Sequence, residues 1–193
     1  MNLPNKLSIL RICMIPLFVA AFYVTALPMN YVISAVIFAL AAATDFLDGH
    51  IARKYNLVTN LGKFLDPIAD KVLVSTALIV LITLPNVLSP LWAIAVAIIL
   101  ARELIVSGFR TVAASRNLVL AADKVGKVKT LFQDVAIVVL LVGAQGYLGG
   151  TLILGVTPIV FAGLILLGIA TLLTIISGVN YIVKNRQVLK EEK

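Results

Sequence analysis

Cysteine and charge are both scarce in this chain, and each scarcity excludes a class of protein. The single cysteine, Cys13, rules out an internal disulfide, and it lies in an apolar run where we expect it to be buried. Only 13% of the residues are charged, whereas 61% are hydrophobic, well above the roughly 45–50% of soluble domains. A soluble protein of 193 residues has too small an interior for so many apolar side chains, so the composition predicts a membrane protein.

Apolar runs of roughly 20 residues, long enough to cross a bilayer, recur along the whole chain. Six can be drawn, and none of the chain is left for a separate soluble domain, so we expect one membrane domain over residues 1–193. The predicted spans are Leu7–Leu27, Tyr31–Ala52, Leu65–Leu84, Leu91–Ala114, Val125–Tyr147 and Leu152–Val183.

Charge is absent from three connections between these spans, at residues 25–30, 85–90 and 146–151. Every lysine and arginine maps to the opposite side. Because positive charge is retained in the cytosol, this alternation predicts an all-α integral membrane protein with six transmembrane helices and both termini inside. The net charge of +7 then forms a cytosolic face that attracts anionic headgroups and phosphate-bearing substrates, and we expect no nucleic acid partner.

Four of the nine acidic residues fall in one predicted hairpin, on the same side as the basic residues. Asp45 and Asp48 end the second span, and Asp66 and Asp70 begin the third, at spacings that share a helix face. Four carboxylates converging beside hydrocarbon need compensating cations, and an oxygen-only set suits two Mg²⁺ or Mn²⁺ ions. The structural alternative is that they cap helices or pair with the nearby cations Arg53, Lys54, Lys63 and Lys71.

These residues resemble the signature of the CDP-alcohol phosphotransferases. The pattern reads Asp45-x-x-Asp48-Gly49-x-x-Ala52-Arg53, eight further residues, then Gly62-x-x-x-Asp66-x-x-x-Asp70. The resemblance implies a six-helix membrane fold, usually homodimeric, with a two-metal site open to the cytosol. It implies that all four aspartates bind metal, with Asp70 also a candidate for the base that deprotonates the acceptor hydroxyl. It assigns contacts with the CDP-linked lipid to Gly49, Ala52, Arg53 and Gly62.

Three further stretches are similar to one bacterial branch of that family: Asn2 to Arg11, Ala101 to Arg110, and Gly126 to Thr130. This similarity implies that CDP-diacylglycerol and glycerol 3-phosphate give phosphatidylglycerol phosphate and CMP in the cytoplasmic membrane. It also adds Asn5 and Ser8 as contacts for the CDP-lipid, although helix capping and interfacial anchoring explain these residues nearly as well.

A phosphorylated acceptor needs cations beyond those that the donor uses, and arginine suits phosphate through its planar fork. Arg102, Arg110 and Lys127 are therefore candidates for binding the acceptor phosphate, against the alternative that they are ordinary positive-inside residues. We interpret Lys129 as an ordinary positive-inside residue and Glu103 as a group that orients Arg102 or Arg110.

Three other functions are compatible with parts of the pattern. Within the same family, the acceptor could be inositol phosphate, serine or phosphatidylglycerol. An intramembrane prenyltransferase also binds a metal diphosphate with aspartates, but it lacks the Gly-x-x-Ala-Arg continuation seen here. An ion-coupled transporter normally binds its ion near the midplane, whereas every ionisable group in this chain maps to one side.

Overall fold

The computed structural model describes residues 3–54, 60–84, 89–115, 124–146 and 156–186, without the side chains of 3–4, 45–54, 60–61, 63–64 and 124. All the regular elements in these ranges are α-helices, as predicted. They are α1 (Leu3–Tyr23), α2 (Asn30–Lys54), α3 (Asn60–Ile82), α4 (Pro90–Ser115), α5 (Lys124–Ala144) and α6 (Pro158–Lys184). Three described stretches, Asn5–Tyr23, Pro90–Ser115 and Pro158–Lys184, are long and apolar enough to cross a membrane.

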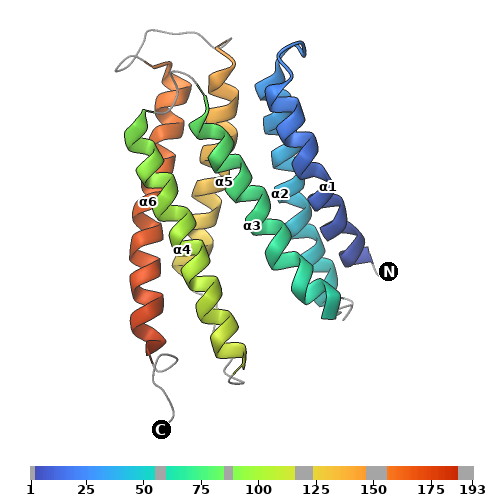
Figure 1. Cartoon of the computed structure of the whole chain (residues 1–193), viewed down its shortest axis with the longest axis vertical. Helices are drawn as coiled ribbons and strands as arrows, with labels where there is room; N and C mark the ends of the chain where they lie inside the picture. The colour runs from blue at the N-terminus through green and yellow to red at the C-terminus, as the bar shows by residue number, and fades with distance from the viewer. Residues whose placement is uncertain (1–2, 55–59, 85–88, 116–123, 147–155, 187–193) are drawn as a thin grey trace.

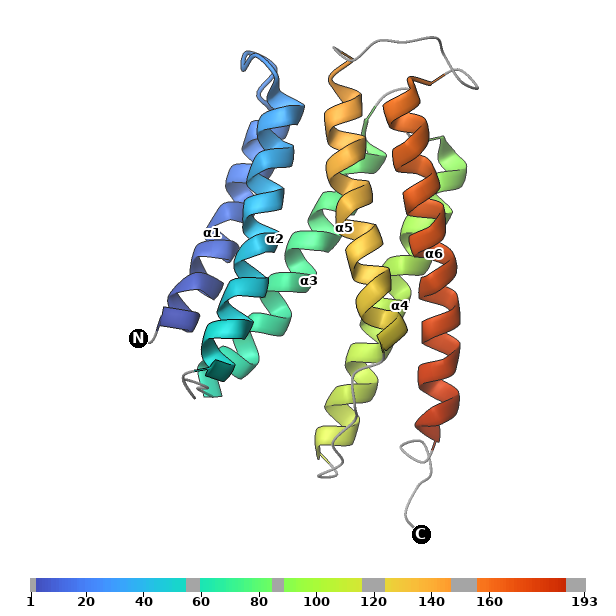
Figure 2. The same ribbon diagram turned by 180° about the vertical axis from the view of Figure 1, so that it is seen from behind.

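The helices run alternately up and down, so the start of α1 and the end of α6 lie at the same end of the bundle (Figure 1). Helix α1 packs on α2, while α6 packs on α4 and α5. Helix α3 contacts both groups, as the view from behind also shows (Figure 2). The alternation brings the end of α2, the start of α3, the end of α4, the start of α5 and the end of α6 to one end of the bundle.

Polar and apolar side chains are distributed as expected for a bundle in lipid. Leu91, Leu104 and Leu131 are 76%, 71% and 63% exposed, whereas a water-soluble monomer rarely exposes extensive apolar surface. Cys13, expected to be buried, is exposed on this outer surface as well. Among the side chains that the structure describes, ten polar or charged ones are buried instead: Asn5, Ser8, Arg11, Asn30, Ser34, Lys129, Gln133, Thr171, Thr174 and Ser177.

The interface between α1 and α2 combines an aromatic core with one buried cation. The rings of Phe18 and Phe38, both fully buried, lie 6.1 Å apart. Further toward the start of α1, the buried Arg11 donates from Nε to the Ala41 carbonyl at 3.2 Å and to Thr44 Oγ1 at 3.3 Å. These bonds fix α1 against the part of α2 that precedes its two aspartates.

The interface between α5 and α6 depends on small residues. A Cβ at Gly163 would lie 2.8 Å from the Leu140 side chain and 3.3 Å from its backbone nitrogen. Gly143 faces Val160 in the same manner, with a would-be Cβ 3.1 Å from the Val160 backbone nitrogen. Small residues at such positions let helix backbones approach closely, which is how helices associate in lipid.

Helices α1, α3 and α6 begin several residues away from the starts of the spans predicted there. Helix α6 begins at Pro158 rather than Leu152, because Thr157 caps it by accepting from the Val160 N–H and Pro158 suits the first helical position. Helix α3 begins at Asn60 rather than Leu65, since a helix can continue past its apolar run into polar surroundings. Gly62 and Pro67 therefore both lie inside α3.

The contact between Gly163 and Leu140 generates a stability prediction. Gly163→Ala should lower the free energy of unfolding by about 1–2 kcal/mol, because the overpacking cost exceeds the gain in helix propensity. The measurement is the thermal unfolding midpoint in detergent. Gly168→Ala, on the same helix, is the control, since a Cβ there would meet only Trp92 at 3.7 Å. Equal midpoints for the two variants would contradict the close packing of α5 and α6.

Candidate functional site

A polar cleft of about 360 Å³ opens at the end of the bundle where the charged residues gather. Helices α3, α4, α5 and α6 all contribute to its wall. Its lining residues are Asp66, Pro67, Asp70, Lys71, Arg102, Glu103, Arg110, Gly126, Lys127, Thr130 and Tyr181. The cleft therefore has an acidic side on α3 and a basic side on α4 and α5.

The acidic side consists of Asp66 and Asp70, which lie one turn apart on α3 and are both half-buried. Ser8 of α1 is completely buried and donates a hydrogen bond to Asp66 Oδ1. This bond comes from a neutral hydroxyl, so it orients the carboxylate without neutralising it. Asp66 and Asp70 thus lie in the cleft wall beside Lys71 of the same helix.

The donor chemistry on α3 suits a hard divalent ion, because both groups are carboxylates. The described residues alone contain no group of three or more possible metal ligands. The predicted partners Asp45 and Asp48 belong to α2, which packs on α3, but their side chains lie outside the described residues. The same holds for the predicted lipid contacts Gly49, Ala52 and Arg53.

Arg102 is held at the basic side by contacts with α6 and with its own neighbour. Its Nη2 donates to Ser177 Oγ at 3.0 Å, and its Nη1 lies 3.4 Å from Glu103 Oε1. Gly178 leaves space for the arginine, since a Cβ there would lie 3.0 Å from Arg102 Cγ. Nε of Arg102 is buried without an acceptor among the described residues.

Arg110 lies two turns further along α4 and is positioned by Tyr181 of α6. Nε of the arginine donates to the tyrosine hydroxyl at 3.4 Å, and its guanidinium carbon lies 5.7 Å from the ring centroid. Such cation–π contact is attractive and leaves the remaining N–H groups available. Lys127 of α5 is exposed and completes the basic side.

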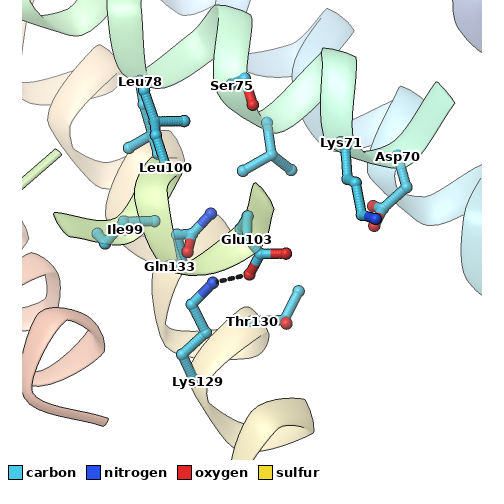
Figure 3. A pocket seen from close by; sticks show the side chains of 11 residues that line it. Asp70, Lys71, Ser75, Leu78, Ile99, Leu100, Glu103, Lys129, Thr130 and Gln133 are labelled. Carbon is cyan, nitrogen blue, oxygen red and sulfur yellow. Dashed lines mark hydrogen bonds and ion pairs between the residues drawn. The ribbon is translucent and has the colours of Figure 1, made fainter. Parts of the chain in front are cut away.

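Glu103 links α4 to α5 behind this basic side (Figure 3). Its carboxylate accepts from Lys129 of α5, whose side chain is only 1% exposed. Lys71 of α3 donates to Ser107 Oγ, which in turn donates to the backbone carbonyl of Glu103. The interpretation of Lys129 as an ordinary positive-inside residue was wrong: it is a buried cation, because Glu103 compensates its charge.

The cleft brings together five residues that the sequence singled out: Asp66, Asp70, Arg102, Arg110 and Lys127. Asn5 and Ser8 are buried in α1 and Gly62 is buried in α3, while none of these three lines the cleft. Sequence reasoning missed the contributions of Ser177, Tyr181, Thr130 and Gln133. A signal was present, because each is a polar group within an otherwise apolar helix.

Comparison with known proteins agrees with this geometry. A sequence model of the CDP-alcohol phosphatidyltransferase family matches residues 1–176. The chain belongs to this family. Membership decides against the intramembrane prenyltransferase and the ion-coupled transporter considered from sequence.

Several relatives of this phosphatidyltransferase carry the name CDP-diacylglycerol–glycerol-3-phosphate 3-phosphatidyltransferase. The protein from Rickettsia felis is 42% identical, with 93% of both chains aligned. That from Bacillus subtilis is 40% identical over 98% of this chain and 97% of the relative. That from Salmonella typhimurium is 35% identical over 94% and 93%. The similarity therefore extends over nearly the whole length of each protein.

The pairing of Glu103 with Lys129 generates a second stability prediction. Glu103→Gln should destabilise the protein by about 3 kcal/mol, because breaking a buried pair leaves an uncompensated charge. Adding Lys129→Met should restore most of the loss, since the orphaned ammonium is then removed. Unfolding in detergent measures both effects. Lys127→Met, which removes an exposed cation two residues away, is the control and should change stability by less than about 0.5 kcal/mol. A Glu103→Gln variant as stable as this control would refute the pairing.

Proposed function

We propose that this phosphatidyltransferase moves the phosphatidyl group of CDP-diacylglycerol to glycerol 3-phosphate, giving phosphatidylglycerol phosphate and CMP. The observation that carries the proposal is the cleft itself, which is lined by Asp70 together with Arg102, Arg110 and Lys127. A phosphorylated alcohol presents a hydroxyl and a dianion a few bonds apart, and the cleft offers a carboxylate for the hydroxyl together with four cations, Lys71, Arg102, Arg110 and Lys127. The names of the relatives from Rickettsia felis and Bacillus subtilis support the same acceptor.

The basic side argues for a phosphorylated acceptor within the family. Serine and phosphatidylglycerol bring no phosphate monoester to the cleft, so the cations would have no matching dianion. Inositol phosphate does bring one, but its ring is bulkier than a three-carbon chain. Glycerol 3-phosphate therefore fits best, and inositol phosphate is the second candidate.

Asp66 and Asp70, together with Asp45 and Asp48, would hold two Mg²⁺ or Mn²⁺ ions. Bound there, the ions would supply positive charge for the diphosphate of the donor and for the departing CMP. The CDP-lipid would be bound by Asn5, Ser8, Gly49, Ala52, Arg53 and Gly62. Support for this assignment comes from the signature spacing and from the carboxylate chemistry of the cleft wall.

In the proposed reaction, Arg102, Arg110 and Lys127 bind the phosphate of the acceptor and orient its carbon chain. Asp70 accepts the proton of the C1 hydroxyl. The resulting oxygen bonds to the phosphorus that bears diacylglycerol, and the bond from that phosphorus to the bridging oxygen of CMP breaks. Holding the two reactants in one cleft lowers the barrier mainly through orientation and charge stabilisation.

We further propose that residues 1–193 form one membrane domain with six spans, both termini in the cytosol and the cleft on the cytosolic side. This arrangement suits the substrates, because CDP-diacylglycerol is held by its acyl chains in the bilayer while glycerol 3-phosphate arrives from water. The positive-inside pattern supports the orientation. The bacterial cytoplasmic membrane and a homodimeric state belong to the same proposal.

An acceptor panel tests the proposed activity. Purified protein with CDP-diacylglycerol and Mg²⁺ should release CMP fastest with glycerol 3-phosphate, because this acceptor carries a hydroxyl and a phosphate monoester without the bulk of an inositol ring. The panel adds inositol phosphate, serine and phosphatidylglycerol, with released CMP as the readout. A chelator should stop the release and excess Mg²⁺ should restore it. Faster release with any other acceptor would overturn the assignment.

The role of Asp70 is tested by Asp70→Asn, which removes the base while keeping the shape of the side chain. The variant should bind CDP-diacylglycerol but lose turnover by about 10²–10⁴-fold, the usual contribution of a positioned base. Equilibrium binding of labelled lipid and CMP release are measured separately. Asp134→Asn is the control, since this residue lies on α5 and does not line the cleft. Full turnover by Asp70→Asn would exclude the base role.

A further inference from the structure

A second, smaller cavity of about 30 Å³ adjoins the cleft. The two share Asp70, Lys71, Glu103 and Thr130, so they meet along a common rim. From this rim the cavity extends toward the middle of the bundle, where its walls are Val74, Ser75, Leu78, Ile99, Leu100, Lys129 and Gln133 (Figure 3). Its volume suits a group the size of one or two water molecules, so it can take a hydroxyl but not a phosphate.

Gln133 is one of three polar residues at the inner side of this cavity, with Ser75 and Lys129. Its side chain is 1% exposed, and Oε1 is buried with no hydrogen-bond partner among the described residues. The nearest cation in the wall, Lys129, is already bonded to Glu103. A buried amide oxygen without a donor is unfavourable, and it accepts hydrogen bonds only. The ligand of this cavity must therefore carry an O–H or N–H donor.

We infer that the small cavity receives the secondary hydroxyl of a three-carbon polyol phosphate, with Gln133 as the residue that selects it. The inference rests on the proposed function and adds to it the basis of acceptor selection. Glycerol 3-phosphate has its attacking hydroxyl on C1, its phosphate on C3 and one remaining polar group on C2.

The position of the C2 hydroxyl follows from where the two ends of glycerol 3-phosphate bind. With the C1 hydroxyl at Asp70 and the phosphate at Arg102 and Arg110, the middle carbon lies over the rim between Asp70 and Glu103. The cavity opens at this rim, so the C2 hydroxyl enters it and donates to Gln133 Oε1. The surrounding Val74, Leu78, Ile99 and Leu100 exclude charged or larger substituents.

The test compares glycerol 3-phosphate with 3-hydroxypropyl phosphate, which has the same attacking hydroxyl and phosphate but no C2 hydroxyl. Wild-type protein should prefer glycerol 3-phosphate by about tenfold to hundredfold in kcat/KM for CMP release, the usual effect of a buried acceptor left unpaired. Gln133→Met should remove most of this preference by slowing the reaction of glycerol 3-phosphate. The reaction of 3-hydroxypropyl phosphate should change little, because that acceptor makes no bond to Gln133.

Gln145→Met is the matched control, because it makes the same substitution near the other end of α5. The Oε1 atom of Gln145 accepts from the Tyr31 N–H at 3.0 Å, away from both cavities. This variant should keep the full preference. Gln133→Leu repeats the test if the methionine variant does not fold, and the wild-type comparison requires no variant at all.

Two results would overturn the inference. Equal use of the two acceptors by wild-type protein would mean that the cavity holds only water. If a folded Gln133 variant still preferred glycerol 3-phosphate to the same extent, a group other than Gln133 would bind the C2 hydroxyl. Failure of the proposed function itself looks different, since wild-type protein would then release no CMP with glycerol 3-phosphate while using another acceptor.

Discussion

The ion pair between Glu103 and Lys129 is the interaction on which the basic side of the cleft depends. A buried ammonium in an apolar bundle needs a carboxylate within reach, and Glu103 provides it while also contacting Arg102. Because Lys71 donates to Ser107, which in turn donates to the backbone carbonyl of Glu103, α3, α4 and α5 converge on one turn of helix. Arg102, which lines the cleft, is therefore held in place by the hydrogen bonds and ion pairs around Glu103.

The sequence was sufficient to predict the features that depend on composition and periodicity. Six helices were expected and six are described, and Asp66, Asp70, Arg102, Arg110 and Lys127 were singled out before their common cleft was known. These residues stand out because a charged side chain in an apolar helix is energetically costly and therefore indicates a functional site.

The remaining features depend on which helices pack together, and a linear pattern does not contain that information. The burial of Lys129 follows from its contact with Glu103, 26 residues away. Tyr181 is relevant only because α6 lies beside α4, and Gln133 only because a small space is left between α3, α4 and α5. The start of α6 was misplaced because an apolar run continues upstream of the capping Thr157.

The two sides of the cleft are carried by different helices, and this has a consequence for the lipid environment. Asp66 and Asp70 belong to α3, whereas Arg102, Arg110 and Lys127 belong to α4 and α5. Helices in a bilayer adjust their tilt when hydrophobic thickness changes. A change in tilt of α3 relative to α4 alters the gap between the two sides of the cleft. The width of the cleft therefore depends on the thickness of the membrane that surrounds the bundle.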